Sequence, residues 1–198
     1  PARNRLRDSD KNVHTEFKRQ MGTDFRFLFP ANGRNMLPEE LSADVLKSLR
    51  GDVRDRCGED VEAIVISVPA AFELGQCAAT KKAAELAGFR QCHLVQEPVA
   101  AALAYGFQQD ISKAYWLVYD FGGGTFDAAI MKAEEGNISV LNHGGDNYLG
   151  GSDIDWAIVD KLIVPKLLEE FDLDDFERGN RKWESTFARI KWAAENAK

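Results

Sequence analysis

The sequence predicts an α/β fold of mixed sheets flanked by helices, and three observations favour it. Between residues 63 and 106, strand-like apolar runs alternate with stretches of helical periodicity. Between residues 115 and 142, strand-like segments follow one another, which is typical of a meander. The length of 198 residues is enough for one large domain or two small lobes. We therefore expect part of a first lobe over residues 1–113 and part of a second lobe over residues 114–198.

The composition excludes several classes of protein. The 32 acidic and 25 basic side chains give a formal net charge of −7, which argues against a protein that grips nucleic acid through bulk charge. No window approaches about 18 uninterrupted apolar residues, so no membrane partner is expected. Cys57, Cys77 and Cys92 lack CxxC spacing, which argues against a zinc ribbon or a disulfide scaffold. A reducing, cytoplasmic location is the default.

The first elements are marked by turn and capping signals. Alternating phenylalanines over residues 25–29 predict a short strand that ends at Pro30. Pro38 and the two acids after it suit the first turn of a helix, which should end at Gly58. The nearly continuous β-branched run over residues 63–69 predicts a strand that is covered on both faces.

The same reasoning extends to the rest of the chain. Helices are expected over residues 73–87, where Gly88 follows, and over residues 97–106. A short strand is expected at residues 93–95, between these two helices. A polar loop over residues 107–113 comes next, and strands follow at residues 115–120, 126–131 and about 138–142. A helix over residues 153–171 should be kinked by Pro165, and an acidic loop over residues 169–177 precedes a last helix with its apolar stripe starting at Trp183.

The sharpest chemical signal is the stretch DFGGGTFD at residues 120–127. Three glycines between two strands let the backbone approach a bulky anion and present N–H groups to phosphate oxygens. The stretch is not a P-loop, since no Lys-Ser/Thr follows and a strand stands where a P-loop has a helix. Two flanking carboxylates would repel phosphate unless a cation lies between them, and Mg²⁺ with several retained waters fits that need. The alternative is a glycine-rich hairpin whose aspartates only cap its ends.

Together with other stretches, this motif resembles the ATPase domain of the seventy-kilodalton heat-shock (DnaK-type) chaperones. The further stretches are VISVPAAF at 65–72, QEPVAAALAYG at 96–106, GDNYLGGSDID at 145–155 and RIKWAAENAK at 189–198. The compact stretch FKRQMG at 17–22 resembles most closely the HscC-like bacterial members. The resemblance covers essentially the whole chain, and it implies a partial actin/hexokinase-like ATPase fold.

The resemblance implies catalytic roles for five residues. Lys18 aligns with the lysine that positions the γ-phosphate and the attacking water, and Glu97 with the acid that orients this water and the hydrated magnesium. Asp120 would hold magnesium through waters, while Thr125 and Asp127 would position the water. From the residues alone, a solvated lysine is the better interpretation of Lys18, and an acid before a proline at a helix start, as at Glu97, is ordinary capping.

The resemblance also implies nucleotide contacts, at Gly122, Gly123, Gly124 and Thr125 for the phosphates and at Gly150, Gly151, Glu195 and Lys198 towards the adenosine. A helix that opens at the paired glycines would place its N-terminus beside the ribose-phosphate. A tight loop capped by Ser152 or Asp153 is the alternative for the glycines. An exposed i,i+3 ion pair is the alternative for Glu195 and Lys198.

The function implied by the resemblance is that of a molecular chaperone. Binding and hydrolysis of ATP with Mg would be coupled to binding and release of unfolded polypeptides. The implied partners are the nucleotide, a J-domain co-chaperone and a nucleotide-exchange factor, with no nucleic acid. The full-length protein would be an ATPase and a stress-response protein.

The chain also departs from the family pattern. It begins at Pro1 without a signal-peptide pattern, and the first phosphate loop, the last adenosine loop and the peptide-binding domain are absent. We therefore expect a piece of a longer protein that is inactive in isolation. Cys77 stands where the family has an arginine, so coupling between domains would be rewired or weakened. An inert thiol is the plainer interpretation of Cys77 itself.

Two other functions stay open from the sequence. A nucleotide-sensing or scaffolding relative would bind ATP without hydrolysing it, with altered coupling at Cys77. A sugar or acetate kinase of the same superfamily would share the glycine hairpin, but it should lack the matches at 96–106 and 145–155.

Overall fold

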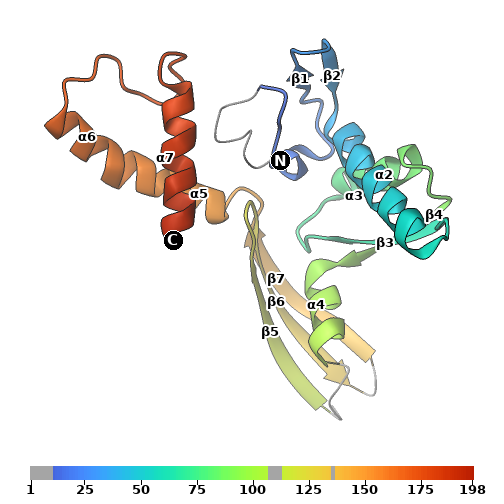
Figure 1. Cartoon of the computed structure of the whole chain (residues 1–198). Helices are drawn as coiled ribbons and strands as arrows, with labels where there is room; N and C mark the ends of the chain where they lie inside the picture. The colour runs from blue at the N-terminus through green and yellow to red at the C-terminus, as the bar shows by residue number, and fades with distance from the viewer. Residues whose placement is uncertain (1–10, 107–112, 135–136) are drawn as a thin grey trace.

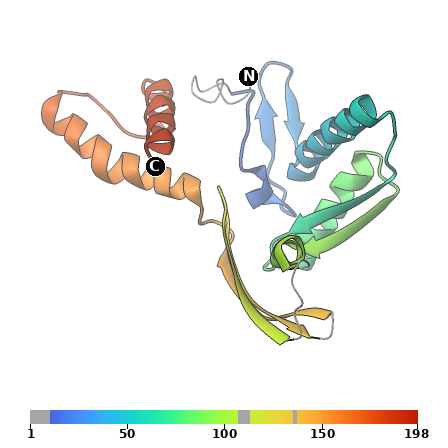
Figure 2. The same cartoon turned by 60° about the horizontal axis from the view of Figure 1, so that its bottom comes forward.

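The computed structural model describes residues 11–106, 113–134 and 137–198. Residues 11–96 lie on one side of the molecule and residues 151–198 on the other, with a curved sheet between and below them (Figure 1). The same separation is visible after rotation (Figure 2). Most of the predicted loop at 107–113 falls outside the described residues.

The first part of the chain contains a short helical turn, a hairpin and a long helix. These are η1 (Phe17–Gln20), β1 (Phe27–Phe29), β2 (Arg34–Met36) and α2 (Pro38–Cys57). The strand expected over 25–29 is confined to β1, which pairs antiparallel with β2. The predicted limits of α2 are confirmed, because Pro38 is its first residue and Gly58 caps its end with a φ of 73°.

A parallel pair of strands follows, made of β3 (Ala63–Val68) and β4 (Gln91–Gln96) with α3 (Leu74–Leu86) between them. Ala83 and Ala84 of α3 are fully buried, and Ile64 and Ile66 pack against the same cluster. The expectation that the strand is covered on both faces is wrong for the described structure, since Val65 is 66% exposed. Ile64 and Ile66 face the cluster formed with α2 and α3, whereas Ala63, Val65 and Ser67 are exposed, so the side chains of β3 alternate between half-buried and exposed over this stretch.

The central sheet is an antiparallel meander covered by a helix. Its strands are β5 (Lys113–Phe121), β6 (Phe126–Glu134) and β7 (Asn137–Asp146), and α4 (Glu97–Gly106) precedes them. Ala102 of α4 packs with Ala129 and Met131 of β6, and these three side chains are almost fully buried. The meander is confirmed, and each strand runs further than its apolar pattern because the ladder continues through polar residues.

The last part of the chain is helical. It consists of α5 (Gly151–Ile158), η2 (Val159–Ile163), α6 (Val164–Glu170) and α7 (Glu184–Ala197). The helix expected over residues 153–171 contains a π-helical turn, η2, just before Pro165, in which the N–H of Val164 donates to the carbonyl of Val159, and the kink at Pro165 stays a prediction. Val159, Phe176 and Phe187 form the core that holds α7 beside η2.

Candidate functional site

The glycine triplet forms the turn between β5 and β6. Asp120 and Asp127 are paired across the two strands, and the N–H of Gly122 donates to the carbonyl of Thr125 at 2.9 Å. Within the described residues, no acceptor is assigned to the backbone N–H groups of Gly123, Gly124 and Thr125. These three groups are therefore candidate donors for an anion.

The start of α5 is interlocked with this turn. The N–H groups of Gly151 and Ser152 donate to the carbonyls of Gly122 and Gly123, each at 2.9 Å. The helix opens at the paired glycines as predicted, with Gly150 as its N-cap, so the alternative of Ser152 or Asp153 as N-cap is wrong. The carboxylate of Asp153 accepts the N–H of Gly150 at 2.8 Å. The first amides of α5 thus hold the glycine turn, and in this arrangement they are engaged with protein carbonyls and not offered to a ribose-phosphate.

Lys18 and Glu97 meet although 79 residues separate them. Lys18 lies on η1, and its ammonium Nζ donates to Oε1 of Glu97 at 2.7 Å. The Lys18 side chain is 45% exposed and the Glu97 side chain only 16% exposed. Glu97 is also the first residue of α4, so its negative charge can lie at the helix N-terminus and pair with Lys18 at the same time.

Asp127 lies next to this pair and is 4% exposed. Its pKa is raised above the usual range for an aspartate, mainly because burial penalises the charged form and further because the charges of Glu97 and Asp120 repel it. Lys18 and a backbone hydrogen bond from Ala71 act in the opposite direction. The site therefore holds several carboxylates close to one lysine.

Replacing Asp127 with asparagine should raise the free energy of unfolding at neutral pH by about 1 kcal/mol, because a buried and energetically unfavourable charge is removed. An aspartate whose pKa is raised on folding costs stability as pH rises through that pKa. The gain should therefore grow from acid to neutral pH and vanish below the unfolded pKa of aspartate. Denaturant unfolding at several pH values measures it. A constant difference across this range would contradict the burial of the charge.

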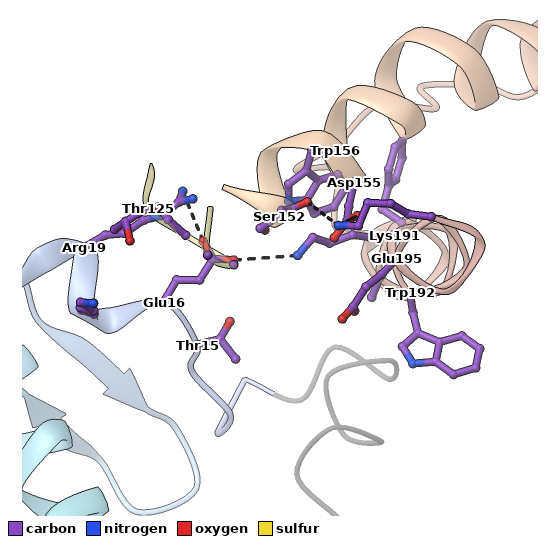
Figure 3. A pocket seen from close by; sticks show the side chains of 18 of the residues that line it. Thr15, Glu16, Arg19, Thr125, Ser152, Asp155, Trp156, Lys191, Trp192 and Glu195 are labelled. Atoms are coloured by element: carbon purple, nitrogen blue, oxygen red, sulfur yellow. Dashed lines mark hydrogen bonds and ion pairs between the residues drawn. The ribbon is translucent and has the colours of Figure 1, made fainter. Parts of the chain in front are cut away.

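A cleft of about 1060 Å³ lies beside the glycine turn. The predicted residues that line it are Lys18, Asp120, Gly122, Gly123, Gly124, Thr125, Gly151, Glu195 and Lys198. Glu97, Asp127 and Gly150 are not part of its lining. The cleft runs between η1, the turn, α5 and α7, and Figure 3 shows its side chains. The structure therefore brings together residues from four segments that are far apart in the sequence.

Lys198 is anchored on α5. Its ammonium donates to Oδ1 of Asp155 at 2.8 Å and to the carbonyl of Gly151 at 3.0 Å. Asp155 is 2% exposed, so the lysine supplies the charge that a buried carboxylate requires. Glu195 lies on α7, whose C-cap is Lys198, and also lines the cleft.

Sequence reasoning missed several cleft residues, namely Glu16, Arg19, Asp155, Trp156 and Lys191. Arg178 lies 4.6 Å from the Trp156 ring centroid and Lys191 lies 5.5 Å from it, which are cation–π distances. The signal that could have found Arg19 is its position directly after Lys18 in a short helical turn.

The fit of a metal ion can be judged from the donor set. Among the residues that the structure describes, no three His, Cys, Asp or Glu side chains are grouped so as to hold an ion directly. Asp120, Asp127 and Glu97 nonetheless interact electrostatically, with Lys18 as a nearby positive charge. Such a set fits a hydrated Mg²⁺, which retains several waters and needs few direct protein ligands.

An α/β chain with a glycine hairpin, free turn amides, a lysine and several acids beside one cleft has the features of a polyphosphate-binding protein. The sequence model of the family described as Hsp70 protein matches residues 2–198. The chain therefore belongs to the Hsp70 family, whose members are ATPases with an actin-like fold and act as chaperones. Among the described residues, no helix is long and apolar enough to cross a membrane.

Proposed function

We propose that this chain is part of the ATPase domain of a DnaK-type chaperone closest to the HscC-like bacterial members, with residues 1–113 in the first lobe and 114–198 in the second. The full-length protein would couple hydrolysis of Mg-ATP to binding and release of unfolded polypeptides in the cytoplasm. One observation carries the proposal: the Lys18–Glu97 pair and buried Asp127 lie beside a glycine turn with unengaged amides.

The turn would bind the phosphates. The N–H groups of Gly123, Gly124 and Thr125 are available to the β- and γ-phosphate oxygens, and Gly122 keeps the turn closed through its bond to Thr125. Lys18 would add a positive charge at the γ-phosphate. Phosphoryl transfer depends on such positioning and charge neutralisation more than on covalent help.

The acids would position the attacking water. Asp127 has a raised pKa, which brings this carboxyl closer to the range of a useful proton acceptor. Glu97, Thr125 and Asp127 would orient the water, and Glu97 and Asp120 would hold the hydration shell of the metal. When bound, Mg²⁺ neutralises phosphate charge.

The adenosine would lie towards α7. Glu195 and Lys198 line that end of the cleft, and Gly150 and Gly151 bring the start of α5 close to the turn. The engaged amides of α5 support an indirect role for these glycines, as the support of the turn.

The proposed partners are an unfolded polypeptide, a J-domain co-chaperone and a nucleotide-exchange factor, each acting on the full-length protein. The alternative is a nucleotide-sensing relative with altered coupling. The match to the Hsp70 family does not favour this alternative. It rests on Cys77, since its thiol, 4.0 Å from the carbonyl of Phe72, cannot replace the charge-assisted bonds of a guanidinium.

Replacing Asp120 with asparagine tests the proposal. In single-turnover assays of the full-length protein, we expect Mg-dependent ATP hydrolysis to fall at least about tenfold, because an amide holds the hydrated ion less strongly. Raising the Mg²⁺ concentration should recover part of the rate. Asp52→Asn in α2, away from the cleft, is the control. An unchanged rate in D120N at limiting Mg²⁺ would remove Asp120 from the site.

A further inference from the structure

Arg19 is a cleft residue to which the family resemblance gave no role, and its guanidinium makes several hydrogen bonds. Its Nε donates to the carbonyl of Gly124 at 2.8 Å, and its two terminal nitrogens reach both carboxylate oxygens of Asp153, at 3.3 and 2.5 Å. The side chain is 14% exposed. One guanidinium thus joins η1 to the glycine turn and to the first turn of α5.

The two partners of Arg19 are themselves parts of the phosphate-binding arrangement. A Cβ on Gly124 would lie 2.9 Å from Nε of Arg19, so the missing side chain of Gly124 makes room for the guanidinium. Asp153 also accepts the N–H of Gly150, whose neighbour Gly151 donates to the turn. Arg19 therefore binds the turn directly and also through the start of α5.

Electrostatics supports a persistent contact. The hydrogen bond to Asp153 raises the pKa of Arg19, and the reciprocal bond lowers the pKa of Asp153, so each charge stabilises the other. A bidentate guanidinium–carboxylate pair also fixes orientation, which a lysine would not do.

A second link starts from the N-cap of η1. Oε2 of Glu16 lies 3.3 Å from Nη1 of Arg19, and Oε1 of Glu16 lies 3.9 Å from Nζ of Lys191 on α7 (Figure 3). The charged chain Asp153–Arg19–Glu16–Lys191 therefore crosses the cleft from α5 to α7. Phe17 packs η1 against the cluster of Phe27, Met36 and Leu41, and the polar contacts of Arg19 and Glu16 join η1 to the turn and to α7.

Lys18 precedes Arg19 on the same short helical turn. Consecutive side chains of a 3₁₀ helix point about 120° apart. Lys18 accordingly reaches Glu97 on α4, while Arg19 reaches Gly124 in the glycine turn and Asp153 on α5. The anchoring of Arg19 fixes the backbone that carries Lys18.

We infer that Arg19 is a positioning residue for hydrolysis, which holds Lys18 in place relative to the glycine turn by binding Gly124 and Asp153. This inference rests on the proposed function, because it assigns to Arg19 the placement of the lysine that acts on the γ-phosphate. Arg19 acts through Lys18 and the turn, and not on the phosphate itself.

The test compares single-turnover ATP hydrolysis and nucleotide affinity in variants of the full-length protein. Arg19→Ala should slow hydrolysis by roughly tenfold to a hundredfold, since small misplacement of a reacting group has effects of this size. Nucleotide affinity should change less than about threefold. Asp153→Asn, which keeps the size of the side chain, should act in the same direction, and Arg19→Lys should not restore the rate.

The decisive measurement is a double-mutant cycle with Lys18→Ala. If Arg19 acts through Lys18, Arg19→Ala should change the rate less than about twofold when Lys18 is already absent. Equal effects of Arg19→Ala in both backgrounds would overturn the inference. If Arg19→Ala unfolds the protein, the cycle is carried out with Asp153→Asn.

Arg50 provides a matched control. Its guanidinium binds both oxygens of Asp60, at 2.7 and 2.8 Å, and the carbonyl of a glycine, Gly88, at 2.9 Å, away from the cleft. Arg50→Ala should leave hydrolysis unchanged, and a loss equal to that of Arg19→Ala would mean a general structural effect. Asp120→Asn is measured in parallel, because loss of rate in that variant but not in Arg19→Ala contradicts this inference alone. An unchanged rate in Asp120→Asn at limiting Mg²⁺ removes Asp120 from the proposed site, which counts against the proposed function and not against this inference.

Discussion

Replacing Lys18 with alanine should slow ATP hydrolysis by the full-length protein about a hundredfold to a thousandfold, the size expected when a preorganised charge at the transition state is lost. The ammonium is held 2.7 Å from Glu97, and its positive charge also acts on Asp127. Nucleotide binding should stay measurable by calorimetry, because the turn amides and the α7 side of the cleft remain. Single-turnover assays measure the rate.

The control for this variant is Lys47→Ala. Lys47 is a half-exposed lysine of α2 that forms an i,i+3 pair with Asp44, so its loss removes a lysine and an ion pair outside the cleft. Its hydrolysis rate should equal that of the unaltered protein. If Lys18→Ala loses binding and hydrolysis to the same degree, Lys18 serves binding or folding, and the proposed catalytic role is wrong.

The local elements were predictable where a single residue type imposes a backbone conformation. Gly58 and Gly88 follow α2 and α3 with φ angles of 73° and 87°, which residues other than glycine rarely adopt. Both helix ends were predicted from these glycines. Pro165 likewise predicted an irregularity in its helix, and the structure has the π-helical turn η2 just before it. These signals are local, so one sequence is enough to detect them.

Burial was less predictable, because the sequence of a strand does not show which other elements pack against it. The apolar run of β3 suggested two covered faces, yet Ile64 and Ile66 pack on helices while Val65 remains exposed. The apolar pattern of α2 similarly continues through Leu49, which is 54% exposed. Propensity identified these segments correctly as a strand and a helix, but it could not tell how many layers cover them.

The candidate site shows the same division. The glycine turn and its flanking acids were found because they are contiguous, and their pairing across β5 and β6 follows from the hairpin. The contacts of Arg19 span 105 residues to Gly124 and 134 residues to Asp153, and no local pattern reports a contact of that range. The engagement of the α5 amides was missed for the same reason, since their acceptors lie in the glycine turn.

Replacing Gly150 with alanine should lower the free energy of unfolding by about 2 to 3 kcal/mol, the upper part of the range for overpacking. A Cβ at this position would lie 2.5 Å from the backbone N of Gly124 and 2.6 Å from the carbonyl carbon of Gly123. The φ angle of Gly150 is −165°, an extended conformation open to any residue, so the expected cost comes from contact and not from backbone strain. These atoms belong to the interlocked turn and cannot move aside as a flexible side chain would.

Gly123→Ala is the matched control, because a Cβ at Gly123 meets nothing within 4 Å and lies in the same turn. Its unfolding free energy should change by less than about 1 kcal/mol, the usual limit for a glycine without special geometry. Denaturant unfolding of both variants measures the difference. Nucleotide binding should also weaken in Gly150→Ala, since the amides of Gly124 and Thr125 move when α5 is pushed from the turn. Equal stability of the two variants would show that α5 does not pack on the turn as described. The support of the phosphate-binding amides would then be assigned to Arg19 alone.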